Sequence, residues 1–234
     1  MSAILSLEHV SKRYGYRRIL DDITFSLDTG EFIMLIGNNG AGKSTLLRII
    51  STLSKPTQGR ITFHGINQKD SLKEWRQKIG IISHENRLYG DLSSIDNLRI
   101  FGTLYGVEDL KIKTDNILQE TDLSHVARLP VGNFSSGMIK RLMIARLMLC
   151  QPEILILDEP FTGLDQHSNS WFHNYLHEFH QQGGTVLIAT HQLELGLNLA
   201  TRVLVLHKQR IQHDNSTAGL SVNQCVNWLD NNAV

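Results

Sequence analysis

Short apolar runs and helical patterns alternate over most of the chain. Apolar and polar positions alternate at 4–10 and 23–27, as in half-buried strands, whereas the apolar runs at 33–36, 154–157 and 186–189 are nearly continuous. Continuous runs are typical of strands buried on both faces of a parallel sheet. Together with weaker strand patterns, the full set of expected strands is 4–10, 23–27, 31–36, 59–63, 79–82, 154–158, 185–189 and 201–206. The pattern predicts an α/β fold with a parallel sheet and an antiparallel β edge formed by the first strands.

The middle of the chain has a different character. Residues 86–150 show helical spacing and no convincing strand pattern. The expected helices are 43–53, 72–77, 96–105, 109–119, 137–150 and, at the end of the chain, 221–230, with others between the later strands. We therefore predict one domain over 1–234. Its core combines 1–85 with 151–234, and 86–150 is a helical insertion.

One glycine-rich segment carries the strongest chemical signal. It reads Gly37-Asn38-Asn39-Gly40-Ala41-Gly42-Lys43-Ser44-Thr45 and matches G-x-x-x-x-G-K-[ST] between a strand and a helix. Glycines let the backbone wrap around phosphate with its N–H groups free, and the helix N-terminus adds partial positive charge. Lys43 is then expected to reach the β- and γ-phosphates and Ser44 to bind Mg²⁺. The alternative, a chance match in a turn, leaves the strand–loop–helix context unexplained.

Two adjacent carboxylates end a predicted buried strand. The run 154–157 is entirely apolar and is followed by Asp158 and Glu159. Ligands of open α/β sheets bind at the carboxyl ends of the strands, so Asp158 is expected to hold the Mg²⁺ shell and Glu159 to activate water. A strand that merely ends in solvated acids is the alternative, and the nearby phosphate loop argues against it.

A second possible anion-binding helix start lies at 133–138. Ser135 has the chemistry of a helix N-cap, and Gly137 leaves the backbone of the first turn exposed. Taken alone, this segment is better explained as an ordinary serine cap.

Composition excludes several classes. The chain has 234 residues, with 23 Lys plus Arg against 23 Asp plus Glu, so its formal net charge is zero. This balance argues against a general nucleic-acid binder. We find no apolar run long enough to span a membrane and no secretory signal at the start. The two cysteines, Cys150 and Cys225, form no disulfide framework, which fits a reducing compartment.

Taken in order, these motifs resemble those of the ATP-binding subunits of ABC transporters. Residues 134–138 (Phe-Ser-Ser-Gly-Met) resemble the family's L-S-G-G-Q signature, and 154–159 resemble the second Walker motif. Asp165 lies in a segment that resembles the D-loop, His191 matches the switch histidine, and Tyr14 matches the aromatic that stacks on adenine. The resemblance extends from about 5 to 211 and implies a P-loop ABC ATPase fold, with 86–150 as the signature subdomain.

The resemblance also implies a mechanism and partners. Two subunits, expected to be identical, would sandwich two ATP molecules, with the phosphate loop of one facing Ser135 and Gly137 of the other. Lys43, Glu159 and His191 would be catalytic, and Asp165 would communicate across the interface. A separate transmembrane permease would dock on the helical insertion. The subunit itself would be cytoplasmic and peripheral to the cell membrane, and would bind no nucleic acid.

Two departures from the family pattern bear on the role of His84 and on the class of transporter. His84 stands where the family usually has Gln. Imidazole is shorter and can titrate near neutral pH, so we keep His84 in the nucleotide site without assigning it to the metal. The Ser-Ser-Gly-Met signature resembles type-2 exporter ATPases, and with His84 and the short length it resembles haem exporters of cytochrome c maturation. Drug, lipid or polysaccharide export remains open.

Three simpler explanations and one rival function remain. Tyr14 could be a surface aromatic at a turn, and His191 an ordinary histidine after a strand. His173, His177 and His180 share one helical face, a spacing that could hold zinc, although a solvated or half-buried face explains them better. The rival function is a soluble ABC-type ATPase that acts on nucleic acid, the ribosome or a protein complex, although no coiled-coil heptads and only one phosphate loop are present.

Overall fold

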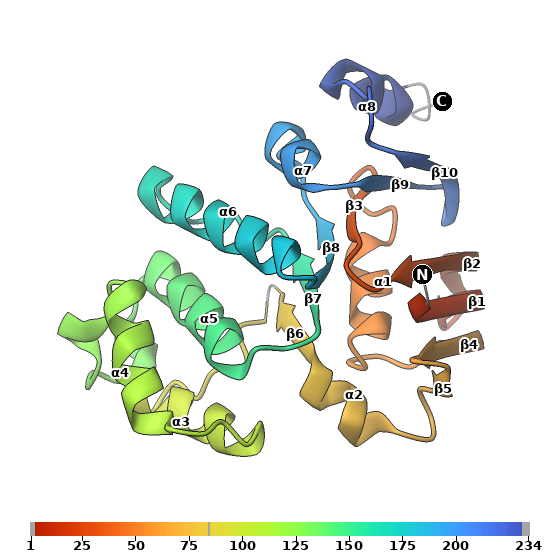
Figure 1. Ribbon diagram of the computed structural model, residues 1–234. Coiled ribbons are helices and arrows are strands. Elements are labelled where there is room, and N and C mark those ends of the chain that lie inside the picture. The colour runs from red at the N-terminus through yellow and green to blue at the C-terminus, as the bar shows by residue number, and fades with distance from the viewer. Residues whose placement is uncertain (1–2, 84, 231–234) are drawn as a thin grey trace.

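The computed structural model describes residues 3–83 and 85–230, and within them a six-stranded sheet forms the centre of the fold (Figure 1). The strand order is β10-β9-β3-β8-β7-β6. The strands are β3 (Phe32–Ile36), β6 (Ile79–Ile82), β7 (Ile154–Asp158), β8 (Thr185–Ala189), β9 (Arg202–His207) and β10 (Arg210–Ser216). All neighbours pair in parallel except β10, which is antiparallel to β9. The predicted α/β fold with a parallel sheet is confirmed.

The first strands form a separate antiparallel sheet and not an edge of the parallel sheet. A second sheet has the order β2-β1-β4-β5 and is antiparallel throughout. It consists of β1 (Ala3–Tyr14), β2 (Arg17–Asp28), β4 (Gln58–Phe63) and β5 (Ile66–Asn67). Alternation along β1 and β2 correctly predicted antiparallel strands with one buried face, but could not show which strands they pair with. The antiparallel edge of the parallel sheet is β10.

Eight α-helices cover the sheets and build the middle of the described chain. They are α1 (Lys43–Ile50), α2 (Leu72–Lys78), α3 (Ser94–Leu104), α4 (Leu110–Glu120), α5 (Ser136–Cys150), α6 (Gln166–Gln181), α7 (Leu193–Leu199) and α8 (Val222–Asp230). Helices α3, α4 and α5 pack around a small core of their own, which includes Leu98, Leu118 and Leu142. This cluster lies inside the predicted insertion 86–150.

Burial on two faces explains the continuous apolar runs of the central strands. Along β3, Ile33 and Leu35 join a core shared with α1 and the antiparallel sheet. Phe32, Met34 and Ile36 point to the other face, into a core shared with α5 and α6. All five residues of β3 are at most 1 % exposed. Helices α1 and α5 therefore lie on opposite faces of the parallel sheet.

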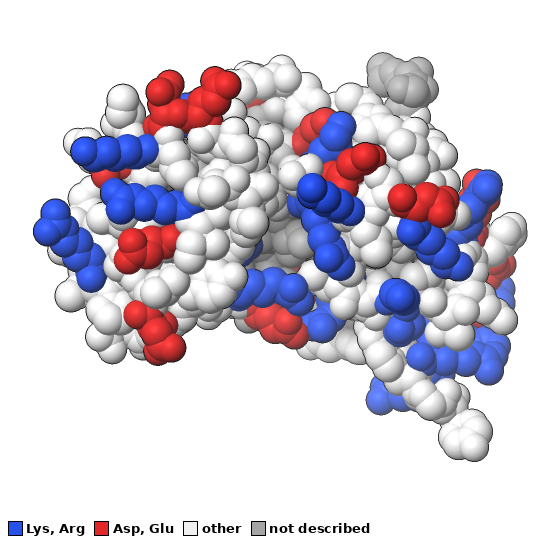
Figure 2. Space-filling model, turned by 90° about the horizontal axis from the view of Figure 1, so that it is seen from below, with Lys and Arg blue, Asp and Glu red and all other residues white. Residues whose placement is uncertain are grey.

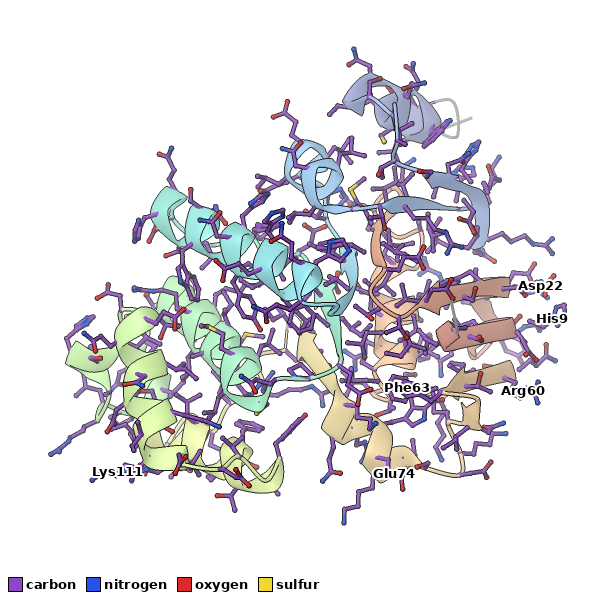
Figure 3. All side chains as sticks on the ribbon, in the orientation of Figure 1. His9, Asp22, Arg60, Phe63, Glu74 and Lys111 are labelled. Atoms are coloured by element: carbon purple, nitrogen blue, oxygen red, sulfur yellow. The ribbon has the colours of Figure 1, made fainter. Side chains whose placement is uncertain are left out.

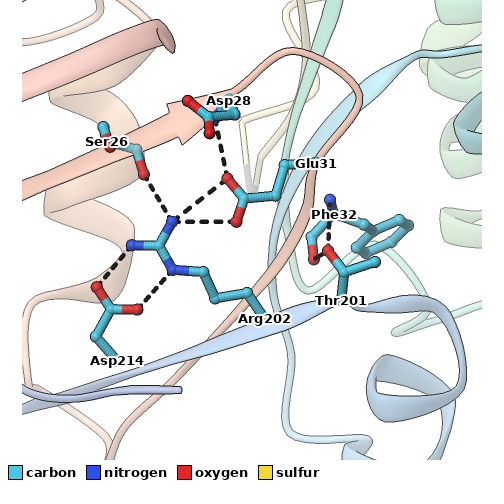
Figure 4. A network of polar contacts seen from close by, with 7 residues as sticks. All are labelled: Ser26, Asp28, Glu31, Phe32, Thr201, Arg202 and Asp214. Atoms are coloured by element: carbon cyan, nitrogen blue, oxygen red, sulfur yellow. Dashed lines mark hydrogen bonds and ion pairs between the residues drawn. The ribbon is translucent and has the colours of Figure 1, made fainter. Parts of the chain in front are cut away.

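A charged network joins the two sheets at the start of β9 (Figure 4). Arg202 donates to both carboxylate oxygens of Asp214 on β10, at 2.5 and 2.6 Å. It also donates to Glu31, at 3.1 Å, and to the backbone oxygen of Ser26 at the end of β2, at 3.0 Å. The hydrogen bond to Asp214, and then that to Glu31, raises the pKa of Arg202 although burial opposes this. The network fixes β2 and β10 to the edge of the parallel sheet.

The antiparallel sheet carries exposed polar side-chain pairs between neighbouring strands. His9 Nδ1 lies 2.7 Å from Asp22, and Arg60 lies 2.8 Å from Glu8. Figure 3 shows His9, Asp22 and Arg60 on the side of the molecule opposite Lys111, which lies in α4. Exposed pairs of this kind contribute little to stability.

Candidate functional site

The predicted phosphate loop connects β3 to α1, and two of its glycines are packed too closely for a side chain. A Cβ at Gly37 would lie 2.3 Å from the backbone oxygen of Leu206. Gly42 has φ 112°, and a Cβ there would lie 2.8 Å from Leu20 Cδ2. Only glycine allows this close wrapping, which leaves a backbone cradle at the start of α1. Such a cradle fits a phosphate group.

Lys43 is folded back onto this loop. Its Nζ donates to the backbone oxygens of Gly37, at 2.6 Å, and Asn38, at 3.4 Å, and the residue is 8 % exposed. Burial lowers the pKa of Lys43, while the charges of Glu159 and Asp158 oppose that shift. The predicted lysine and the predicted carboxylates therefore lie in one electrostatic environment. Ser44 and Thr45 occupy the next positions in the first turn of α1.

The two predicted carboxylates lie at the carboxyl end of β7. Asp158 is its last residue and is 5 % exposed. Glu159 follows with φ 47°, and its N–H donates to the backbone oxygen of Ala189 on β8, at 2.8 Å. Its Oε2 accepts from the His191 N–H at 3.3 Å, and His191 Nε2 lies 3.4 Å from Oε1 without hydrogen-bond geometry. The structure thus brings Glu159 and His191 together.

The second predicted anion site is the start of α5. Ser135 is the N-cap, and its Oγ accepts from the Met138 N–H at 3.3 Å. The predicted N-cap is confirmed. A Cβ at Gly137 would lie 3.4 Å from the backbone oxygen of Gly163, so this helix start touches the loop after β7. Because α5 and α1 pack on opposite faces of the sheet, Ser135 and Gly137 belong to a different part of the surface from the phosphate loop (Figure 1).

Asp165 has a local role that the motif did not reveal. It is the N-cap of α6, and its Oδ1 accepts from the Ser168 N–H at 2.8 Å. These hydrogen bonds from Ser168 lower the pKa of Asp165. The spacing of Asp165 and Ser168 is a capping pattern that sequence alone could have indicated.

A further predicted residue, Tyr14, lies on the antiparallel sheet. Tyr14 ends β1 with 52 % of its surface exposed, and Lys12 Nζ lies 4.8 Å from the centre of its ring. Adenine stacking by Tyr14 stays a prediction. His84 lies outside the described residues. An unforeseen contact reaches the phosphate loop as well, since Asn38 Nδ2 donates to the backbone oxygen of Leu229 in α8, at 3.2 Å.

The histidines of α6 form no metal site. Among residues 3–83 and 85–230, no group of three or more His, Cys, Asp or Glu is arranged to hold a metal ion. His180 contacts the backbone oxygen of Gly30 at 3.0 Å, and His177 contacts Gln181 at 2.9 Å. These contacts favour the interpretation of a half-buried helical face.

No sequence pattern indicates a groove that lies between α2, α3 and α5. It measures about 540 Å³, and Figure 2 shows a hollow with Lys and Arg side chains around it on this face. Arg76, Arg87 and Arg146 line it together with aromatic side chains of the α3 region. Arg146 is 9 % exposed, donates to the backbone oxygen of Ile81 at 2.9 Å and lies 4.8 Å from the Phe101 ring centre. The groove is therefore cationic and partly aromatic.

Comparison with known proteins identifies relatives over most of the chain. The model of the family described as "ABC transporter" matches residues 20–162. The Nod factor export ATP-binding protein I of Rhizobium johnstonii is 35 % identical over 208 residues, which cover 88 % of this chain and 67 % of that protein. The lantibiotic transport ATP-binding protein SrtF of Streptococcus pyogenes is 34 % identical over 212 residues, which cover 89 % of each chain.

Solved structures agree in fold. The structure of an ATP-binding subunit of an ABC transporter has a TM-score of 0.86 and 27 % identity, covering 99 % of this chain and 95 % of that one. A dimeric structure of MJ0796, a bacterial ABC transporter cassette, has a TM-score of 0.83 and 25 % identity, covering 91 % and 98 %. Within the described part of this chain, no helix has the length and apolar character needed to cross a membrane.

Proposed function

Because the chain belongs to the ABC transporter family and is an ATP-binding ATPase coupled to transport, we propose that it powers export through a separate membrane subunit. The observation that carries this proposal is that Lys43, folded onto the glycine-lined loop, lies in the field of Asp158 and Glu159, and that Glu159 in turn contacts His191. The relative named for Nod factor export supports the direction, and the relative named for lantibiotic transport supports the coupling to transport.

In the proposed site, each group has one task. The loop 37–45 and Lys43 bind the phosphates of ATP, while Tyr14 stacks on adenine. Ser44 and Asp158 supply the hard oxygen donors that Mg²⁺ prefers, so this pair fits the metal. A bound Mg²⁺ would neutralise charge on the transferred phosphoryl group. Glu159 orients and polarises the attacking water, and His191 stabilises the γ-phosphate.

A second subunit, most simply another copy of this chain, completes the site. Ser135 and Gly137 start a helix whose free N–H groups favour a negative charge, yet they lie on the other side of the sheet from the loop. Pairing of two copies in opposite orientation would set this helix start against the partner's γ-phosphate, with Asp165 at the contact. The dimeric structure of MJ0796 supports such an assembly.

The membrane partner would bind the helical part, for which we propose the bounds 86–150. The groove beside it, between α2, α3 and α5, is the surface we assign to a segment of the permease, since the exposed Arg76 on its lining can pair with a carboxylate. The subunit would then lie on the cytoplasmic face of the membrane and reach the bilayer only through this partner.

The cargo is a narrower proposal. The signature at 134–138 and His84 support a haem-exporter-like subunit, whereas the relatives reported above are named for Nod factor export and lantibiotic transport. Drug, lipid or polysaccharide export is the alternative within the same class. Copurification of the tagged subunit with a membrane permease would support transport. ATP hydrolysis stimulated by nucleic acid or ribosomes without a membrane partner would contradict it.

Glu159→Gln tests the proposed chemistry. The amide keeps the size of the side chain but cannot accept a proton, so we expect ATP to bind normally and hydrolysis to fall by about 100-fold or more. ATP should then hold two subunits together, which size-exclusion chromatography with light scattering detects. Hydrolysis at the wild-type rate would show that Glu159 is not the base.

Ser135→Phe tests the second subunit. A bulky ring at the helix start should block the contact with the partner's nucleotide, so hydrolysis falls while the isolated monomer binds ATP with unchanged affinity. If the monomer no longer bound ATP, the assignment of Ser135 to the nucleotide site of the other subunit would be wrong.

A further inference from the structure

The backbone of Glu159 has a conformation that a glutamate does not readily adopt. Its φ of 47° lies in the left-handed region, which is unfavourable for a residue with a Cβ. Such conformations persist only where the surrounding structure holds them, and they cluster at functional sites.

Contacts fix the peptide groups on both sides of this residue. Its N–H donates to the backbone oxygen of Ala189 on β8, at 2.8 Å. Its C=O accepts from the Thr162 N–H, at 3.3 Å, and from the Nζ of Lys140, at 3.2 Å. The first two contacts lie within the sheet edge and the following turn. Lys140 is the one group among these that comes from the helical part of the molecule, since it lies in α5.

Lys140 is not an ordinary surface lysine. Its side chain is partly buried beside a pocket of about 280 Å³ that Ser136, Thr162 and Gly163 also line. Burial lowers the pKa of Lys140, and the charges of Asp158 and Glu159 oppose that shift. Keeping an ammonium group partly buried is costly, so a contact with the carbonyl of a strained residue is a reason to retain it.

We propose that Lys140 is a positioning residue for hydrolysis, which holds the Glu159 carbonyl so that the carboxylate stays beside His191. This inference rests on the proposed function only in that Glu159 activates the water. It adds a physical connection, because Lys140 lies in the same helix as Ser135 and Gly137. A shift of α5 would therefore move the backbone carbonyl of Glu159, and with it the catalytic carboxylate of the same subunit.

Lys140→Met removes the ammonium group and keeps an apolar chain of similar length. We expect kcat for ATP hydrolysis to fall by about tenfold with KM for ATP unchanged, because binding does not use this contact. Lys140→Arg should recover at least half of the wild-type kcat, since a guanidinium can reach the same oxygen. Lys113→Met, at an exposed lysine of α4, is the matched control and should keep wild-type kcat. Thermal denaturation checks that each variant is folded, and Lys140→Gln replaces the Met variant if that one unfolds.

A double-mutant cycle with Glu159→Gln decides whether Lys140 acts through Glu159. If it does, Lys140→Met should change the residual hydrolysis of the Glu159→Gln protein by less than twofold, measured with enzyme in excess over labelled ATP. A further tenfold loss in that background, or wild-type kcat for Lys140→Met alone, would overturn the inference. Wild-type hydrolysis by Glu159→Gln alone would instead overturn the assignment of the base, and the inference with it.

Discussion

Gly42→Ala separates the steric need for glycine in the phosphate loop from its backbone freedom. Gly42 has φ 112° and ψ 6°, and an added methyl would lie 2.8 Å from Leu20 Cδ2 and 2.9 Å from the Ile19 backbone oxygen. A residue with a Cβ loses about 1–2 kcal/mol in the left-handed region. Forcing a methyl group into filled space costs about 1–3 kcal/mol more. We therefore expect a total cost of about 3 kcal/mol.

Gly40→Ala is the matched control. Gly40 also has a positive φ, 79°, but a Cβ there meets nothing within 4 Å. Its expected cost is the backbone part alone, about 1 kcal/mol.

Two measurements are needed because the strain can appear in either of two quantities. It lowers the free energy of unfolding, measured in urea, if the loop keeps its shape, or it weakens ATP binding if the loop relaxes first. If all of it appears in binding, Kd rises about 150-fold for Gly42→Ala and about fivefold for Gly40→Ala. Equal summed losses for the two variants would refute the steric argument.

Three further predictions concern stability and reactivity. Burial raises the pKa of the Cys150 thiol from 9.0 to about 12. Its alkylation by iodoacetamide at pH 8 should therefore be about 1000-fold slower than in urea and rise about tenfold per pH unit, as followed by mass spectrometry; equal rates in buffer and urea would contradict this. Arg202→Met should lower the free energy of unfolding by about 2 kcal/mol, because Glu31 and Asp214 lose charged hydrogen bonds, and a loss below about 0.5 kcal/mol would count against the network. Ser135→Ala should cost about 1 kcal/mol through loss of its N-cap, and Ser136→Ala, the control, clearly less.

The sequence predicted the parts of the fold that local pattern determines. Strands expected at 31–36, 154–158 and 185–189 occur at Phe32–Ile36, Ile154–Asp158 and Thr185–Ala189, because a strand buried on both faces must be apolar throughout. The cap at Ser135 was also predictable, since a serine before a helical pattern has a specific hydrogen bond to make.

Features that depend on tertiary contacts were not predictable in this way. Strand β10 pairs with β9 through its backbone, but its side chains are mostly exposed and polar, so no apolar pattern marks it. The left-handed backbone of Glu159 has no sequence signal. Its contact with Lys140 joins two residues that are 19 positions apart in the sequence. Arg146 reads as an interruption of an apolar helix, and only the packed structure shows that it lines a groove.

The contacts of Lys43 have a consequence for the thermodynamics of nucleotide binding. Its ammonium group bridges two backbone oxygens of the phosphate loop, so contacts within the chain itself support the shape of the loop. A preorganised loop loses little conformational entropy on binding, and more of the interaction energy then appears as affinity. In the proposed function, the phosphates would replace these carbonyl groups as the partners of the ammonium group. In the proposed function, Lys43 would thus help to shape the site that binds its own ligand.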